Sequence, residues 1–508
     1  MNDKALATSA AISGHVAVVG AGAMGRGIAL VAASAGHTVL LFDAIAGTAD
    51  KARTQLGRDL DRLVERGRIT VDEARARLAR IVPAAGLDDL RDVSLVIEAV
   101  VEDMSIKRDL FQQLESLVAP DAVLATNTSS LSITGLACEL RYPGRFAGMH
   151  FFNPAPVLPL VEIVHGASTD RSVIAQLQAT AVAWGKTPVV CGSSPGFIVN
   201  RVARPFYGEA MRALEEGAAT PATIDALMRE SGGFRMGPFE LTDLIGQDVN
   251  YSVTESVYKA FHEDPRYRPC AVQQELVLAG HLGRKSGRGF YQYGDAAPAP
   301  EIDTAPAAPM PVRLQVFGRL GPAQPLVAMA GAAGVVVTCH DGPGHMDIDG
   351  LKLCLSDGRL ATERAATEGP VALLDLALDY TNASRLGLAF ADQVPDTMRA
   401  TAIGLLQGMN KQVCIVDDVP GMVVMRTVAM LINEAVDAVY RKVANEADIE
   451  TAMLRGVNYP LGLLDWLQRI GANHVLTVVQ NLDRIHGDGR YRASPLLRRK
   501  AALASAHQ

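Results

Sequence analysis

The chain has 508 residues, of which 49% are hydrophobic and 20% are charged, and its formal net charge at pH 7 is -7. This length is enough for three or four domains with large cores, and the composition is ordinary for a soluble globular protein. The acidic balance disfavours nucleic acid as the main partner, and no apolar run is long enough to cross a bilayer, so we expect no membrane contact.

Neither the N-terminal stretch nor the cysteine pattern indicates a secreted protein. The stretch from Met1 to Gly14 contains one lysine and no apolar core of secretory length, so it does not read as a signal peptide. The six cysteines are scattered without paired spacing. This argues against a disulfide framework or a zinc site, and it predicts a reducing, cytoplasmic location and no metal.

Residues 15–43 read as a strand, a glycine turn, a helix and a second strand. Gly20 permits a tight turn, Gly22 lets the backbone approach a pyrophosphate, and Gly25 allows close packing of the helix. The start of the helix then offers free N–H groups and partial positive charge to phosphates. Asp43 closes the next apolar run, where it can bond ribose hydroxyls and repel a 2′-phosphate. The pattern therefore predicts NAD rather than NADP as the cofactor.

The rest of the N-terminal half alternates strands with helices. Residues 49–80, interrupted by Gly67, read as a helical hairpin, and apolar runs predict strands at 94–98, 122–126, 146–150 and 160–164. This alternation implies a mainly parallel sheet with helices on both faces. From Gly196 to about Tyr293 the apolar spacing is helical.

Residues 294–311 are dominated by Ala and Pro, which is typical of an extended, exposed linker. After them the opening pattern repeats in a broken form. Gly318 keeps the first glycine of the turn, but Leu320 and Ala323 stand where the second and third glycines are expected, and Asp341 closes the next apolar run. Side chains at those two positions would block a pyrophosphate.

Four later segments match the first half in the same order. Residues 373–378 parallel 95–100, residues 385–390 parallel 146–151, residues 419–426 parallel 194–201, and residues 490–492 parallel 266–268. In this alignment Ala389 stands at the position of His150, Met425 at that of Asn200, and Glu162 has no counterpart. The hairpin at 49–80 is also missing. A copy that keeps its core and loses its polar residues is predicted to be structural.

Several motifs in the first half resemble the 3-hydroxyacyl-CoA dehydrogenase family, and the resemblance covers residues 14–293. The motifs are TNTSSL from Thr126, HFFNP from His150, LVE from Leu160 and PGFIVNR from Pro195, with further matches at 236–243 and 285–290. The long tandem form, with NRVARP from Asn200 and LIGQDVN from Leu244, is most similar to the 3-hydroxyadipyl-CoA dehydrogenases of phenylacetate breakdown.

The resemblance implies an α/β Rossmann-like NAD domain plus an all-α C-terminal domain, followed by a degenerate tandem copy of both. The expected segments are an NAD-binding Rossmann domain at 12–195, a helical C-terminal domain at 196–293, a linker at 294–311, a degenerate Rossmann-like domain at 312–418 and a second helical domain at 419–508.

The resemblance also implies the catalytic roles. His150 matches the general base that takes the hydroxyl proton while hydride leaves for the nicotinamide, and a histidine suits this because its free pKa lies near neutral pH. Glu162 matches the carboxylate that orients and polarises this histidine. Ser129 and Asn200 match polar groups that hold the oxygen atoms of the substrate. No metal is needed for this chemistry.

For the cofactor, the resemblance adds four positions near the ribose and nicotinamide to the glycine turn and Asp43. They are Ala99, Glu102, Lys107 and Asn153. Glu102 and Lys107 could equally form an exposed pair on a helix. The basic residues of the hairpin match the family region that helps bind coenzyme A, whose phosphates attract cations, and a solvated helix face explains the same charges equally well. They are Lys51, Arg53, Arg58, Arg62, Arg66 and Arg68.

We therefore expect an enzyme that oxidises (S)-3-hydroxyacyl-CoA to 3-oxoacyl-CoA with NAD. The favoured substrate is 3-hydroxyadipyl-CoA, oxidised to 3-oxoadipyl-CoA in phenylacetate catabolism, and Arg201 and Arg204 are either clamps for its second carboxylate or surface charges. The alternatives are a short-chain 3-hydroxybutyryl-CoA dehydrogenase and a non-catalytic sensor of NAD and acyl-CoA.

The helical segment from Pro420 keeps apolar spacing after losing its catalytic residue. The positions are Val424, Val428, Leu431, Ile432 and Val436. An apolar helix face needs a surface to cover, so we expect residues 420–508 to pack against the helical domain at 196–293 as an internal pseudo-dimer. A homo-oligomer of whole chains is also compatible with the sequence.

Overall fold

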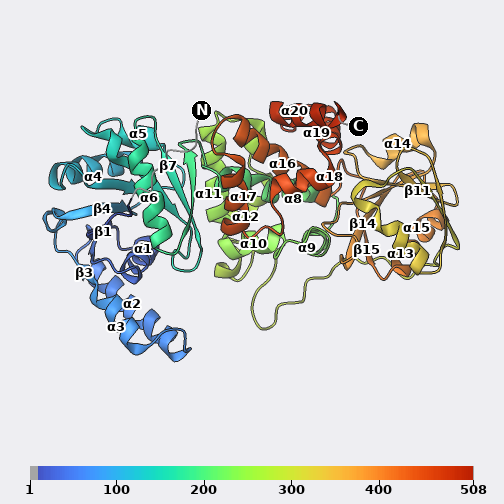
Figure 1. Cartoon of the computed structure of the whole chain (residues 1–508). Coiled ribbons are helices and arrows are strands. Elements are labelled where there is room, and N and C mark those ends of the chain that lie inside the picture. The colour runs from blue at the N-terminus through green and yellow to red at the C-terminus, as the bar shows by residue number, and fades with distance from the viewer. Residues whose placement is uncertain (1–9, 507–508) are drawn as a thin grey trace. The chain divides into compact units, whose positions relative to one another are not determined.

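The computed structural model describes residues 10–506 (Figure 1). Most of the stretch before Gly14, and the last two residues of the segment predicted at 419–508, therefore lie outside the described part. The chain forms two compact units. Within the described part, the first holds residues 10–200 together with Lys442–Val457, and the second holds Arg201–Arg441 and residues 458–506. A segment from the C-terminal half thus belongs to the N-terminal unit.

The first unit is built on an eight-stranded sheet in the order β3-β2-β1-β4-β5-β6-β7-β8. The strands are β1 (His15–Val19), β2 (Val39–Phe42), β3 (Ile81–Pro83), β4 (Val93–Glu98), β5 (Val123–Thr126), β6 (Phe146–Phe151), β7 (Leu160–His165) and β8 (Thr187–Gly192). Neighbours are parallel except for β6 and β7, which are antiparallel. The strand order reverses between β1 and β4, and open α/β sheets bind ligands at such a switch point.

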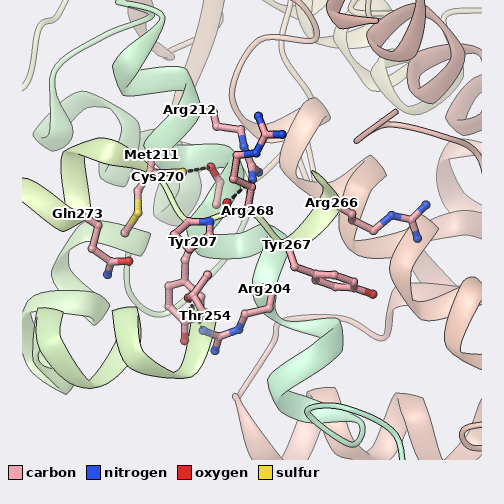
Figure 2. A pocket seen from close by; sticks show the side chains of 12 residues that line it. Arg204, Tyr207, Met211, Arg212, Thr254, Arg266, Tyr267, Arg268, Cys270 and Gln273 are labelled. Atoms are coloured by element: carbon pink, nitrogen blue, oxygen red, sulfur yellow. Dashed lines mark hydrogen bonds between the residues drawn. The ribbon is translucent and has the colours of Figure 1, made fainter. Parts of the chain in front are cut away.

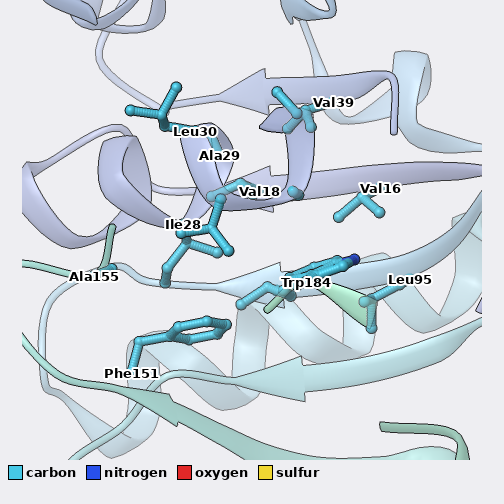
Figure 3. Packing of buried hydrophobic residues seen from close by; sticks show 14 of the residues in the cluster. Val16, Val18, Ile28, Ala29, Leu30, Val39, Leu95, Phe151, Ala155 and Trp184 are labelled. Atoms are coloured by element: carbon cyan, nitrogen blue, oxygen red, sulfur yellow. The ribbon is translucent and has the colours of Figure 1, made fainter. Parts of the chain in front are cut away.

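One face of this sheet forms a large apolar core with three helices. The helices are α1 (Ala23–Ser34), α2 (Thr48–Glu65) and α6 (Arg171–Ala183). Ile28 of α1 packs with Val18 of β1 and Phe151 of β6, and Trp184 at the end of α6 joins the same cluster (Figure 3). Burying each such side chain contributes roughly 1.5–3 kcal/mol, so this face holds the glycine turn firmly in place.

The predicted hairpin at 49–80 is confirmed as α2 followed by α3 (Val71–Ala79), with Gly67 in the left-handed region between them. Thr70 and Glu73 form a capping box at the start of α3. The other helices of this unit are α4 (Met104–Leu117), α5 (Ile133–Ala137) and α17 (Glu446–Gly456), and α7 (Val199–Val202) lies at the boundary between the two units.

Helix α17 comes from the C-terminal half and packs on β7 and β8. The N–H of Gly192, at the end of β8, donates to the carbonyl of Val443 over 2.8 Å. The edge of the first sheet is therefore covered by a helix that lies more than 200 residues further along the chain.

The second unit contains a seven-stranded sheet in the order β10-β9-β11-β12-β13-β14-β15. The strands are β9 (Arg313–Phe317), β10 (Val336–His340), β11 (His345–Ile348), β12 (Leu351–Leu355), β13 (Val371–Leu374), β14 (Arg385–Phe390) and β15 (Gln412–Ile415). β10 and β11 lie on either side of β9, and only residues 341–344 join them. A parallel neighbour needs a long crossover, so this short link explains why β11 is antiparallel to β9. No helical hairpin lies in residues 341–344, between β10 and β11.

The strand order corrects two parts of the sequence alignment. β14 has one antiparallel and one parallel neighbour, as β7 does, so residues 385–390 take the place of β7 and not that of β6. β13 takes the place of β6 and not that of β4. Short apolar runs look alike wherever they lie in a sheet, and this is why the sequence alignment was wrong here.

The register then shows which residues of the second sheet lie at the positions of His150 and Glu162. His150 pairs with Glu162 across β6 and β7. In the second sheet Leu374 pairs with Leu388, and the next residue, Asp375, donates its N–H to the carbonyl of Gly387 over 2.9 Å. Asp375 therefore stands at the position of His150, where the sequence alignment had Ala389, and Gly387 stands at the position of Glu162.

Helices α8 (Arg204–Glu215) and α16 (Val424–Tyr440) of the second unit pack on each other. The other helices of this unit pack around the helical part or on the second sheet. They are α9 (Pro221–Glu230), α10 (Pro238–Ile245), α11 (Gln247–Ala260), α12 (Ala271–Leu278), α13 (Pro325–Ala332), α14 (Ala361–Glu368), α15 (Asp396–Gly408), α18 (Leu463–Ile470), α19 (Ala472–His486) and α20 (Pro495–Ala506). α9 packs on β14, as α17 packs on β7 in the first unit. The N–H of Asp417 donates to the carbonyl of Ala218 over 2.8 Å.

Two buried ion pairs are arranged reciprocally: one joins α7 to α16, and the other joins α16 to α8. In each pair, an arginine and a tyrosine from one half of the chain donate hydrogen bonds to a glutamate of the other half. Arg201 and Tyr267 donate to Glu434 over 2.6 Å each, and Arg426 and Tyr491 donate to Glu209 over 2.9 and 2.8 Å. Removing one partner from such a buried pair leaves an uncompensated charge and costs about 3–5 kcal/mol.

The segment at 294–311 contains no helix or strand and is mostly exposed, as its composition predicts. It is nevertheless docked on the second unit. Asp303 bonds to Thr223 of α9, Ala305 donates to the carbonyl of Val413 in β15, and Ala308 donates to a side chain of α15. Among residues 10–506, no helix is long and apolar enough to cross a membrane, and no cluster of side chains could hold a metal ion.

Candidate active site

His150 and Glu162 face each other from the antiparallel strands β6 and β7. The Nδ1 atom of His150 lies 2.7 Å from Oε2 of Glu162, and both side chains are buried. The other carboxylate oxygen accepts the N–H groups of Ile198 and Val199, each over 2.9 Å. Both oxygens of Glu162 are therefore fixed, and the carboxylate holds the imidazole in one orientation.

This geometry leaves one nitrogen of His150 for chemistry. Because Nδ1 faces the carboxylate, Nε2 is the atom that can exchange a proton with another molecule. The rings of Phe152 and Phe197 lie 4.5 and 5.9 Å from the imidazole ring, centroid to centroid. The arrangement is that of an oriented general base.

Glu102 organises the loop that carries Ser129. Its Oε1 atom accepts the hydroxyl of Thr128 over 2.6 Å, the N–H of Ser129 over 2.9 Å and the N–H of Ser130 over 3.2 Å. Burial alone would raise the pKa of Glu102, but the charge of Lys107 and these hydrogen bonds outweigh it and lower the pKa. The Ser129 hydroxyl also contacts Glu102, and neither it nor Asn200 hydrogen-bonds to His150 within residues 10–506.

Lys107 is not half of an exposed helix pair, because only 1% of its side chain is exposed. Its Nζ lies 2.6 Å from Glu98 and 3.3 Å from Glu102. Glu98, which the sequence analysis did not single out, is fully buried and also accepts the hydroxyl of Thr126 over 2.6 Å. Glu98 could have been predicted from the sequence, because it is an acidic residue at the end of an apolar strand. The same pattern identified Asp43.

The glycine turn has the shape that a dinucleotide requires. Gly20 has φ +102°, and a Cβ there would lie 2.5 Å from the carbonyl oxygen of Ala99. A Cβ on Gly25 would lie 1.7 Å from the carbonyl oxygen of Gly20, whereas one on Gly22 would meet nothing within 4 Å. Gly20 and Gly25 are thus required by the fold itself, and the space over Gly22 is open for a pyrophosphate.

Asp43 lies beside this turn. Its carboxylate accepts the N–H of Ala21 over 2.8 Å and that of Ile45 over 2.9 Å, which orients it at the end of β2. Ala99 donates to the carbonyl of Val19 over 2.7 Å and so joins β4 to β1 at the switch point. Asn153 is exposed just after β6. Asp43 and Ala99 thus lie directly beside the glycine turn.

The charge of Arg201 is compensated by acidic side chains of the protein itself. Arg201 is 1% exposed and pairs with Glu434 over 2.6 Å and with Asp437 over 2.8 Å. Arg204 is also buried, so neither residue is a surface charge. Most basic side chains of the hairpin are exposed, and a cavity of about 360 Å³ lies between α2 and α3.

Three family models match the chain. The 3-hydroxyacyl-CoA dehydrogenase NAD binding domain matches residues 15–194, and the C-terminal domain of the same family matches residues 196–293 and again residues 421–507. The 3-hydroxybutyryl-CoA dehydrogenase reduced Rossmann-fold domain matches residues 353–420. Together the models of the NAD binding domain and the C-terminal domain place the chain in a class of NAD-dependent dehydrogenases.

The relatives agree with this class. The chain is 44% identical over 494 residues to the 3-hydroxyadipyl-CoA dehydrogenase of Escherichia coli (strain K12), covering 97% of this chain and 98% of that protein. It is 41% identical over 291 residues to the 3-hydroxybutyryl-CoA dehydrogenase of Bradyrhizobium diazoefficiens, covering 57% of this chain and 99% of that one. A crystal structure of 3-hydroxybutyryl-CoA dehydrogenase from Escherichia coli K12 aligns with a TM-score of 0.90, at 43% identity, over 98% of this chain and 100% of that one. The chain belongs to the 3-hydroxyacyl-CoA dehydrogenase family.

Proposed function

We propose that this enzyme oxidises (S)-3-hydroxyadipyl-CoA to 3-oxoadipyl-CoA, as a step of phenylacetate catabolism, with NAD as the oxidant and His150 as the general base. The observation that carries the proposal is the His150–Glu162 pair, which is buried, directly hydrogen-bonded and fixed by two backbone N–H groups. The names of the relatives that match both halves of the chain support an acyl-CoA substrate.

In the proposed reaction, Nε2 of His150 takes the proton from the hydroxyl at C3, and the carbon–oxygen bond becomes a carbonyl. Bound NAD supplies the acceptor for the hydride that leaves C3. Glu162 holds the imidazole and compensates the positive charge that develops on it. Ser129 and Asn200 hold the substrate oxygen atoms. Such an oriented base contributes about 10²–10⁴-fold in rate.

NAD would be held by the glycine turn, with its adenosine ribose on Asp43 and its nicotinamide side near Ala99, Glu102 and Asn153. Lys107 acts by fixing Glu98 and Glu102 rather than by an exposed contact. The exposed basic side chains of α2, such as Lys51 and Arg58, are proposed to attract the phosphates of coenzyme A.

The second half is proposed to be a degenerate tandem copy that serves as an internal pseudo-subunit, with the boundaries 12–195, 196–293, 294–311, 312–418 and 419–508. Three observations support this: the similar strand orders, the reciprocal ion pairs of α7, α8 and α16, and the exchange of α9 and α17 between the sheets. The loss of the glycine turn and of the His150 and Glu162 positions supports a structural role. The six free cysteines support a reducing, cytoplasmic location.

The short-chain alternative has one observation in its favour, since the crystal structure that matches the whole chain bears the name 3-hydroxybutyryl-CoA dehydrogenase. A non-catalytic sensor is disfavoured because the acid–base pair is intact. Formation of NADH from (S)-3-hydroxyacyl-CoA tests catalysis. Wild-type enzyme should turn over and the His150→Gln variant should not, whereas a wild type that binds substrate without turnover would support the sensor.

A further inference from the structure

One cavity in the second unit is lined by positive charge without a matching acid. Its volume is about 20 Å³, and its lining includes Arg204, Arg212, Arg266 and Arg268 but no aspartate or glutamate (Figure 2). A cavity of this size admits about one or two groups as large as a water molecule.

Three of the four arginines are accounted for elsewhere. Arg212 pairs with Glu209 over 2.8 Å, and Arg266 pairs with Glu434 over 3.0 Å. Arg268 is exposed to solvent. Only Arg204 is both buried and uncompensated, since no carboxylate of residues 10–506 lies within ion-pair distance of its guanidinium.

The guanidinium of Arg204 uses few of its donors. Nη1 donates to the Thr254 hydroxyl over 3.1 Å, and the cation lies 4.9 Å from the centre of the Tyr207 ring. Nε is buried without a hydrogen-bond partner. Figure 2 shows the three side chains gathered on one side of the cavity. Burial lowers the pKa of Arg204, and the nearby tyrosines offset this only in part.

A buried cation without a counter-charge destabilises a fold, so its presence calls for an anion that binds there. An arginine offers a planar fork of N–H groups that matches the two oxygens of a carboxylate. The cavity is too small for a larger anion. In the second half, Ala429 stands where Arg204 stands in the first, by the alignment of 419–426 with 194–201. The charge is therefore present only in the half that carries His150.

We propose that Arg204 and this cavity form a carboxylate-binding subsite. The carboxylate can come from the far end of a dicarboxylic acyl group or from a free carboxylate ion. We assign the site to the acyl carboxylate, because a dicarboxylic acyl group is the carboxylate that the proposed reaction supplies. This assignment rests on the proposed function.

The test compares the wild type with Arg204→Met, which keeps the bulk of the side chain, and with Arg204→Lys, which keeps the charge but loses the fork. KM for 3-hydroxyadipyl-CoA should rise roughly 10- to 100-fold in Arg204→Met and less in Arg204→Lys, while kcat/KM for 3-hydroxybutyryl-CoA changes less than about threefold. A merely structural arginine would impair both substrates equally.

Thermal unfolding supplies a readout that does not depend on turnover. Removing an uncompensated charge should leave Tm unchanged or raise it in Arg204→Met, whereas Arg201→Met, which breaks a compensated pair, should lower Tm. Free adipate at constant ionic strength should raise the Tm of the wild type but not that of Arg204→Met, and chloride at the same ionic strength should have no such effect.

The outcomes separate the two proposals. If adipate protects through Arg204 but the KM effect is absent, the subsite binds a free carboxylate and the substrate assignment is wrong. If wild type turns over only 3-hydroxybutyryl-CoA, the proposed substrate fails and the adipate shift still decides the subsite. If neither the KM effect nor the adipate shift depends on Arg204, the carboxylate subsite is refuted.

Discussion

Asp375 stands in the second sheet where His150 stands in the first. Its carboxylate accepts the N–H groups of Val424 and Met425 over 2.9 Å each, as Glu162 accepts those at the start of α7. A Cβ on Gly387, opposite it, would lie 3.2 Å from the Cβ of Asp375. One buried carboxylate thus replaces the histidine–glutamate pair. It anchors the following helix as Glu162 does, but the imidazole is absent.

The Glu162→Gln variant should lower kcat by about 10²-fold or more, because the imidazolium loses its counter-charge and the imidazole its fixed orientation. The pH profile of kcat should shift along with the rate. His150→Gln should lower kcat further with little change in NAD affinity. Steady-state kinetics across pH measure both effects, and near-wild-type turnover in either variant would refute the catalytic assignment.

Asp43 should set the preference for NAD. Its carboxylate is oriented by two backbone N–H groups, so it can accept ribose hydroxyls without rearrangement. Asp43→Ala should weaken NAD binding roughly 10-fold and narrow the gap between NAD and NADP. Asp50→Ala, at a nearby exposed position on α2, serves as the control. A wild type that uses NADP as well as NAD would contradict this reading of the strand end.

Asp225 should make stability depend on pH near neutrality. Burial raises its pKa from 3.8 to about 7, although the N–H groups of Phe239 and Glu240 and the hydroxyl of Tyr291 oppose the shift. The pKa of Asp225 is higher in the folded protein than in the unfolded chain. Protonated Asp225 therefore stabilises the fold fully below about pH 4, and this contribution is lost as the pH rises through 7. The loss amounts to about 1 kcal/mol per pH unit within that window.

Urea unfolding at pH 5 and pH 8 measures this dependence. Asp225→Asn, which mimics the protonated side chain, should reduce the difference in unfolding free energy between the two pH values. An equal difference in wild type and variant would show that Asp225 does not titrate in this range.

The sequence was sufficient to predict the dehydrogenase class and the NAD-binding domain, because a glycine turn and ordered motifs have few structural interpretations. The roles of the individual site residues stay predictions. Asp43 directly follows β2, and His150 pairs with Glu162 across two neighbouring strands. Arg201 was misjudged because its partners, Glu434 and Asp437, lie more than 200 residues away and no local pattern reports them. The sequence alignment matched β14 with the wrong strand of the first sheet, because a short apolar run does not indicate the position of a strand in a sheet.

Cutting the chain at about residue 300 should expose surfaces that the C-terminal half covers. The fragment 1–300 loses α17, which packs on β7 and β8, and α16, which packs on α8. It should therefore aggregate or form a homodimer that restores these contacts. Size-exclusion chromatography with light scattering, with and without residues 301–508 supplied as a second chain, distinguishes these states. A monomeric fragment with full activity would contradict the pseudo-subunit proposal.

The most direct test of the whole account is the ratio of kcat/KM for (S)-3-hydroxyadipyl-CoA to that for (S)-3-hydroxybutyryl-CoA, measured by NADH formation in the full-length enzyme. A clear preference for the adipyl substrate, at least about 10-fold, is the expected result if a buried carboxylate contact distinguishes the two. Equal values, or a preference for the butyryl substrate, would contradict the proposed function and favour the short-chain dehydrogenase.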